Sequence, residues 1–446
     1  MCSAPGLRHG ENGRSHPLPG ASVEFPIPDP GRALYTGYVT ASTPEQRRIL
    51  VVLVAAQVLS GAGLAAGITV GALLAQELSG STGLAGVPTA LFTIGSAAAA
   101  VGVGRLSQAR GRRPGLTLGY VVGAVGAMGV VVTAVTANVV LLFVALLVYG
   151  AGTSTNLQAR YAGADLAPPG GRARAVSIVL VATTLGGVVG PNLTAATGSL
   201  AEALGIRPLA GPFLLAAAAY ALAALVLGVF LRPDPLQRAR ELDESPVVAN
   251  AGPARPVDGS VLPGAAVMIV TQLVMVAIMT MTPVHILEHG HGVGAAGAVI
   301  ALHVAAMFLP SPVTGWLVDR VGRVPVAAAS GGTLLAAGVL GAVAPDDSTA
   351  LLAVALVLLG LGWNLGLVSG TAMITDAVPL ARRARTQGTV DVGIALSGAG
   401  AGLASGLVVA GSGYAELSLG GGIVALVMLP FLAAGRRRRI PSDRHA

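Results

Sequence analysis

The segment GRLSQARGRRP at residues 104–114 recurs without a gap as GWLVDRVGRVP at residues 315–325. Two glycines and an arginine keep their places in both copies, as the pairs Gly104 and Gly315, Gly111 and Gly322, and Arg112 and Arg323. The same offset aligns charged residues of the following loop in each copy, Asp165 with Asp376 and Arg172 with Arg383. One offset kept across two separate loops indicates that the chain is built from two repeated halves.

Apolar runs long enough to cross a bilayer surround these two segments. More than half of the 446 residues are hydrophobic, only 11% are charged and 63 are glycine, a composition typical of a membrane-embedded protein. A transmembrane helix needs about 20 apolar residues. We predict twelve such helices, centred near Gly63, Ser96, Val125, Leu147, Gly186, Ala219, Met275, Ala306, Leu334, Leu359, Gly398 and Leu426. The predicted fold class is therefore an all-α integral membrane protein with two pseudo-symmetric six-helix halves.

Arginines alternate between the predicted loops and predict the orientation, because basic residues accumulate in cytoplasmic loops. One set of loops carries nearly all of the arginines, while the opposite set carries Glu77, Glu202, Glu288 and Glu416, with Arg207 as its one arginine. Both termini are thus expected in the cytoplasm, and the protein in the inner (plasma) membrane. The predicted segments are a disordered tail (1–47), the first half (48–231), a cytoplasmic linker (232–260), the second half (261–435) and a basic tail (436–446).

The residue types that are missing exclude several function classes. The chain contains no lysine, which rules out the lysine of a P-loop ATPase and the Schiff-base lysine of a pyridoxal enzyme. The single cysteine, Cys2, can form neither an intrachain disulfide nor a cysteine-rich metal site. We find no nucleophile with a matching base, so an enzyme or a sensor is the least favoured class.

The loop between the second and third predicted helices resembles the signature of the major facilitator superfamily, and its second copy is the fuller version. This resemblance spans residues 48–435 and implies a secondary carrier that works by alternating access. The family's signature carboxylate, which is thought to latch the inward gate through an arginine and a helix terminus, corresponds to Asp319 in the second copy and to Gln108 in the first. The first latch is therefore expected to be weaker. The gating residues implied are Gly104, Gln108, Gly111, Arg112, Gly315, Asp319, Gly322 and Arg323.

Two further features concern packing and charge within the predicted helices. The run GGVVGP at residues 186–191 resembles a glycine-proline motif of family antiporters, and we interpret Gly186, Gly190 and Pro191 as a site of close packing with a kink. Ionised side chains are few in the helices. Asp391, which we count with the gating residues, is predicted to pair with an arginine at the cytoplasmic edge, such as Arg323, in preference to the alternative of a proton-relay role. No carboxylate stands clearly at mid-membrane, so the coupling ion stays open.

Sulfur and nitrogen side chains line two consecutive predicted helices at matched depth. Met275 and Met279 lie four residues apart and share one face of the seventh helix, next to Gln272, and His303 and Met307 have the same spacing in the eighth. Thioether and imidazole together suit Cu(I). Methionine is also a common filler of helix cores, but an intramembrane histidine is a functional candidate by default. These four residues are the predicted copper ligands.

Four polar residues follow at the outer end of the seventh helix, in the run PVHILEHGHG. His285, Glu288, His289 and His291 form a predicted site for capture of an external metal ion, because neutral imidazole binds copper and zinc. An ordinary polar loop is the alternative.

The MxxxM and HxxxM pairs resemble those of CcoA-type copper importers, a branch of the superfamily in which they handle copper for cytochrome oxidase maturation. The resemblance implies copper as cargo rather than as a cofactor, with copper chaperones as partners. We expect no nucleic acid partner and a monomer in the lipid bilayer. Relatives that lack the motifs are associated with riboflavin. The main alternative is a proton-coupled exporter or carrier of a small organic solute, a drug or a riboflavin-like compound, although only about 4% of the residues are aromatic.

Overall fold

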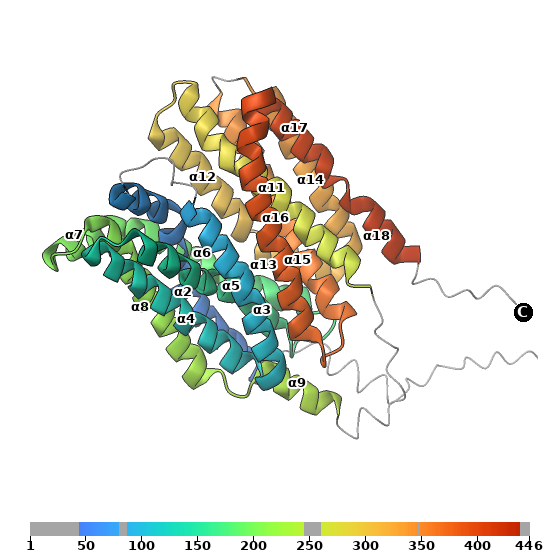
Figure 1. Cartoon of the computed structure of the whole chain (residues 1–446). Helices are drawn as coiled ribbons and strands as arrows, with labels where there is room; N and C mark the ends of the chain where they lie inside the picture. Colours follow the sequence, from blue (N-terminus) through green and yellow to red (C-terminus); the bar gives the residue numbers. More distant parts are fainter. Residues whose placement is uncertain (1–43, 80–86, 245–259, 346–347, 438–446) are drawn as a thin grey trace, which may run out of the picture. The chain divides into compact units, whose positions relative to one another are not determined.

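The computed structural model describes residues 44–79, 87–244, 260–345 and 348–437. The predicted N-terminal tail, most of the linker and the end of the basic tail lie outside these residues. Over the described ranges the chain is helical and contains no strand. The predicted all-α membrane fold is confirmed, and Figure 1 shows its helices following one another from blue to red.

The first half contains α2 (Pro44–Ser79), α3 (Val87–Arg110), α4 (Arg112–Thr136), α5 (Val139–Ala164), α6 (Arg172–Asn192) and α8 (Gly211–Phe230). A short helix α7 (Thr194–Ala203) and a 3-10 turn η2 (Pro208–Ala210) precede α8, and α9 (Pro235–Asp243) follows it within the predicted linker. The side chain of Asn138 accepts a hydrogen bond from the backbone of Leu141 and so caps the start of α5.

The second half contains α11 (Leu262–Glu288), α12 (Val293–Phe308), α13 (Ser311–Val321), α14 (Arg323–Val343), α15 (Thr349–Ala377), α16 (Arg383–Ser412), α17 (Tyr414–Ala425) and α18 (Met428–Arg437). The eighth predicted span is divided into α12 and α13 at Leu309 and Pro310, and the twelfth into α17 and α18.

Eleven helical segments of the described chain are long and apolar enough to cross a membrane. The predicted fifth span, α6, is not among them. It ends at Asn192, one residue after Pro191, and α7 begins at Thr194. Large apolar side chains such as Leu403 and Leu407 are exposed by more than two thirds, as expected where helices face lipid.

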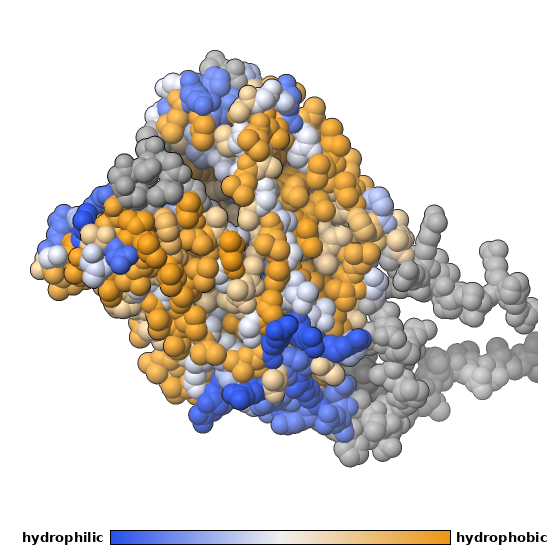
Figure 2. Space-filling model, in the orientation of Figure 1, coloured by the Kyte–Doolittle hydropathy of each residue, from blue (hydrophilic) through white to orange (hydrophobic). Residues whose placement is uncertain are grey.

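One end of the described chain collects the arginines of the loops, and we call it the arginine-rich end. Figure 2 shows hydrophilic residues gathered where α3 and α9 end, below a broad hydrophobic belt. At this end α3 turns into α4 at Gly111, and α13 into α14 at Gly322, with φ of 99° and 109°. Only glycine takes such angles without strain, which explains why both copies of the repeat keep it.

Candidate functional site

The two halves are joined at the arginine-rich end by two equivalent helix caps. Asp319 of α13 accepts hydrogen bonds from the backbone N–H groups of Ala173 (3.3 Å) and Arg174 (2.9 Å) at the start of α6. Gln108 of α3 accepts from those of Ala384 (2.9 Å) and Arg385 (3.4 Å) at the start of α16. Each cap reaches from one half to the other, so this end is closed.

Gln108 therefore occupies the place of the missing carboxylate and keeps its geometry. Its side-chain amide also donates to the carbonyl of Leu380 (3.1 Å), a bond that a carboxylate could not make. What it lacks is negative charge at a helix N-terminus, which is a modest loss. The sequence correctly singled out this position, although the prediction of a weaker latch itself stays a prediction.

Arginine–aspartate pairs follow the same symmetry behind the caps. Arg112 bonds Asp165 (2.7 Å), and Arg323 bonds Asp376 (2.9 Å). Contacts across the halves extend both pairs: Arg112 donates to Gln387 of α16 (2.5 Å), and Arg172 bonds Asp376 (2.6 Å). Each of the two arginine–aspartate pairs thus contacts a residue of the opposite half.

The paired glycines Gly104 and Gly315 lie where helices of opposite halves cross. A Cβ added to Gly104 would lie 3.0 Å from the carbonyl oxygen of Ala384, and one added to Gly315 would lie 2.4 Å from the hydroxyl of Ser177. Any larger residue would force the halves apart at this end.

Replacing Gln108 with aspartate is expected to favour the closed arginine-rich end. A charge at the start of α16 is worth about 0.3–1 kcal/mol, roughly a two- to fivefold shift in population. Spin-label distances across this end in purified protein measure that shift. Ala109→Asp adds the same charge at an exposed neighbouring residue and is the matched control. Equal distance distributions in the Gln108→Asp variant and the wild-type protein would contradict the expectation.

Asp391 does not pair with Arg323, and this prediction was wrong. The carboxylate of Asp391 in α16 instead bonds Arg160 (2.8 Å) and the hydroxyl of Tyr161 (3.0 Å), both in α5. Arg160 is fully buried, so the first half contributes an ionised residue to the interior that sequence reasoning missed. The signal was an arginine embedded in the predicted fourth span.

Within the GGVVGP run the structure describes the surroundings of Gly186 alone. A Cβ on Gly186 would lie 2.1 Å from the carbonyl oxygen of Val58 in α2, so α6 and α2 approach closely at this glycine. Gly190 and Pro191 lie in the last turn of α6, where only the backbone is described.

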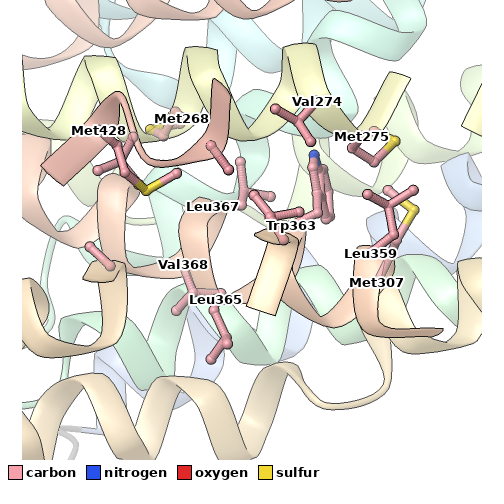
Figure 3. Close-up of a cluster of buried hydrophobic side chains, with 14 of the residues drawn as sticks. Met268, Val274, Met275, Met307, Leu359, Trp363, Leu365, Leu367, Val368 and Met428 are labelled. Atoms are coloured by element: carbon pink, nitrogen blue, oxygen red, sulfur yellow. The ribbon is translucent and has the colours of Figure 1, made fainter. Parts of the chain in front are cut away.

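The three methionines among the predicted ligands belong to one buried apolar cluster. Met275 and Met307 are members, and Met279 is half-buried against it. In Figure 3 the side chains of Met275 and Met307 point toward one another beside Leu359 and Trp363.

His303 is completely buried, and its two ring nitrogens differ. Nδ1 lies 2.8 Å from the backbone carbonyl oxygen of Leu356 in α15, while Nε2 is buried without a hydrogen-bond partner. A carbonyl oxygen can only accept, so Nδ1 carries the proton and Nε2 keeps its lone pair. This is the arrangement in which a neutral imidazole binds a metal ion.

Sequence reasoning missed the contribution of α15, which packs against both ligand helices. A Cβ on Gly360 would lie 2.5 Å from the carbonyl oxygen of His303, and the indole N–H of Trp363 donates to Gln272 of α11 (2.8 Å). The run Gly362 to Asn364, with one of two tryptophans, was the available signal.

The outer residues are brought together only in part. The rings of His285 and His289 lie 4.3 Å apart, and His285 stacks on Tyr414. Glu288 is exposed at the end of α11. Among the residues described, no group of three or more His, Cys, Asp or Glu side chains could hold a metal ion. The four-residue capture site, which included His291, is therefore not assembled in this structure.

Comparisons with known proteins agree with this architecture. The family model described as Major Facilitator Superfamily matches residues 53–308 and 264–445. The uncharacterized MFS-type transporter YdeG of Bacillus subtilis is 54% identical over 89% of this chain and 95% of its own, and the riboflavin transporter RfnT of Brucella anthropi is 32% identical over 86% and 95%. The structure of the proton:xylose symporter XylE superposes with a TM-score of 0.71 at 16% identity, covering 88% of this chain and 96% of the other.

Proposed function

This chain belongs to the Major Facilitator Superfamily and is a transporter of the membrane rather than an enzyme, and we propose that its cargo is copper, moved inward by alternating access. The donor atoms on α11 and α12 support copper as the cargo, since two sulfurs and one imidazole suit Cu(I). The relatives' names specify riboflavin in one case and no cargo in another.

The unpartnered Nε2 of His303 is the observation that supports copper most strongly. Leaving a buried ring nitrogen without a partner costs free energy, so a protein has little reason to keep one at this depth unless something binds it. With the proton held on Nδ1 by Leu356, the imidazole needs no deprotonation before it binds an ion.

The thioethers fit the same cargo. Met275 and Met307 supply soft donors from neighbouring helices, and Met279 lies one turn further out on α11, less buried than Met275. A site of sulfurs and one neutral imidazole holds a monovalent ion without burying a counter-charge. We infer that the ion enters past Met279 and is bound between Met275, His303 and Met307.

A riboflavin-like solute is the second candidate, because the relative RfnT is named a riboflavin transporter. Aromatic side chains of the first half do cluster, with the ring of Tyr149 between 5.5 and 5.7 Å from those of Phe92, Phe213 and Tyr220. Tyr149, Tyr220 and Phe213 are fully buried and form a packed core, so they offer no surface for a flavin ring here.

Uptake into proteoliposomes separates the two cargoes. Purified protein is expected to accumulate Cu(I), measured as metal inside the vesicles, and a large excess of riboflavin leaves that uptake unchanged. Riboflavin uptake without copper uptake would favour the second candidate. If the vesicles accumulate neither copper nor riboflavin, both candidate cargoes are wrong.

A further inference from the structure

The buried pair between Arg160 and Asp391 joins the two halves at a single carboxylate. Asp391 Oδ1 accepts from Arg160 Nη2 (2.8 Å) and from the Tyr161 hydroxyl (3.0 Å). The other oxygen, Oδ2, is buried and has no hydrogen-bond partner. A buried carboxylate normally accepts hydrogen bonds at both oxygens, so Oδ2 is an acceptor without a donor.

The two partners are held unequally. Arg160 also donates to Thr371 of α15 (3.2 Å), to the Tyr161 hydroxyl (2.9 Å) and to the carbonyl of Leu157. Asp391 has only the two bonds from α5. If Asp391 became neutral, Arg160 would keep three partners, whereas α16 would lose its ionic attachment to the first half. The carboxylate is therefore the group whose charge controls this contact.

Other charged or titratable groups on the packed helices are already engaged or distant. Arginine keeps its proton at any physiological pH, and Asp376 is paired with Arg172 and Arg323. The described part of α11 has no charged residue before His285, at its far end. Asp165, which follows α5, is paired with Arg112 of α4 (2.7 Å). The remaining groups are Arg105 and Arg110 of α3, Tyr149 and Tyr161 of α5, Arg383 and Arg385 of α16, and Tyr414 and Glu416 of α17.

We propose that Asp391 binds the proton that drives transport. With Asp391 ionised, its bond to Arg160 holds α16 against α5 and keeps the arginine-rich end closed. A proton entering from the opposite side binds Oδ2 and neutralises the carboxylate, which releases α16 from Arg160. The end then opens, and the proton leaves Asp391 on the arginine-rich side. One proton is taken up and one released in each cycle.

The same network reaches the helix that carries the proposed cargo ligands. The hydroxyl of Thr371, which accepts from Arg160, lies 4.0 Å from the sulfur of Met268 in α11. Met268 shares the helical face of Met275 and Met279 at spacings of seven and eleven residues. This link to copper rests on the proposed function, while the proton-binding role of Asp391 does not.

Spin-label distances across the arginine-rich end test the proposal without any cargo. Labels on Ala109→Cys and Ala381→Cys, in a Cys2→Ser background, lie on opposite halves at exposed positions. The wild-type protein is expected to shift to longer distances as the solution falls from about pH 8 to about pH 5. Asp391→Asn should give the long distance at both values, and Glu416→Gln, an exposed carboxylate, the wild-type shift.

Tyr161→Phe provides a second variant that keeps both charges. Without the hydroxyl that stabilises the ionised carboxylate, the midpoint of the distance change is expected at higher pH. A purely structural contact would not move this midpoint. A pH response of Asp391→Asn equal to that of the wild-type protein would overturn the proposal, as would an unmoved midpoint in Tyr161→Phe. If copper uptake fails in the wild-type protein while these shifts occur, only the proposed cargo is wrong.

Discussion

Replacing His303 with leucine is expected to abolish copper uptake while the protein still inserts and folds. Leucine fills most of the same buried space but removes both ring nitrogens, so the ion loses its nitrogen ligand. Loss of a group that merely supports a metal ligand costs about 10- to 100-fold in affinity, and loss of a ligand itself should cost at least that much. Copper accumulation in proteoliposomes is the measurement, with size-exclusion profiles to check folding.

The methionines of α11 offer a matched pair of variants for the same assay. Met275→Leu removes a sulfur that points toward Met307 and should lower uptake strongly. Met281→Leu makes the same chemical change on the same helix, at a half-buried residue outside the proposed ligand set, and should leave uptake unchanged. If His303→Leu and Met275→Leu transport copper as well as Met281→Leu does, these residues are core packing and not ligands.

Replacing Arg160 with glutamine is expected to destabilise the protein severely. Asp391 would keep a negative charge in the interior with only the Tyr161 hydroxyl as a partner. Removing one member of a buried pair costs about 3–5 kcal/mol, because the other is left uncompensated. Thermal unfolding in detergent should therefore begin at a clearly lower temperature.

The double variant Arg160→Gln with Asp391→Asn separates charge from packing. Neutral amides on both sides can still hydrogen-bond, so much of the lost stability should return. A single Arg160→Gln variant as stable as the wild-type protein would mean that water or another group compensates Asp391, and the pair would then not hold the halves together.

The gate could be predicted from the sequence because it is a repeat. A constant offset identifies equivalent residues without knowledge of their partners, and Gln108 and Asp319 do cap equivalent helices. The positive φ angles of Gly111 and Gly322 explain why those two glycines survive in both copies.

The partner of Asp391 could not be predicted in the same way. Counting from the nearest loop gives the depth of a residue but not the rotation of its helix, so it could not show that Asp391 faces α5. The contact with Arg160 depends on how α5 and α16 face each other, and hydrophobic spacing along one helix carries no such information.

For α11 and α12, which carry the proposed ligands, spacing in the sequence predicts some features and not others. Spacing along α11 and α12 predicts that Met275 and Met307 lie at one level, because rise per residue is fixed in a helix, and the structure places both in one buried cluster. The spacing gave no sign that α15 packs against both helices, or that Leu356 would orient the ring of His303. Those features depend on tertiary packing between helices distant in sequence.

The amount of Cu(I) that the purified protein binds tests the proposed cargo site most directly. Wild-type protein is expected to retain copper after gel filtration under reducing conditions, with nitrogen and sulfur neighbours in its X-ray absorption spectrum, and His303→Leu to retain none. Equal copper on both proteins, or copper on neither, would contradict a site built on the free nitrogen of His303.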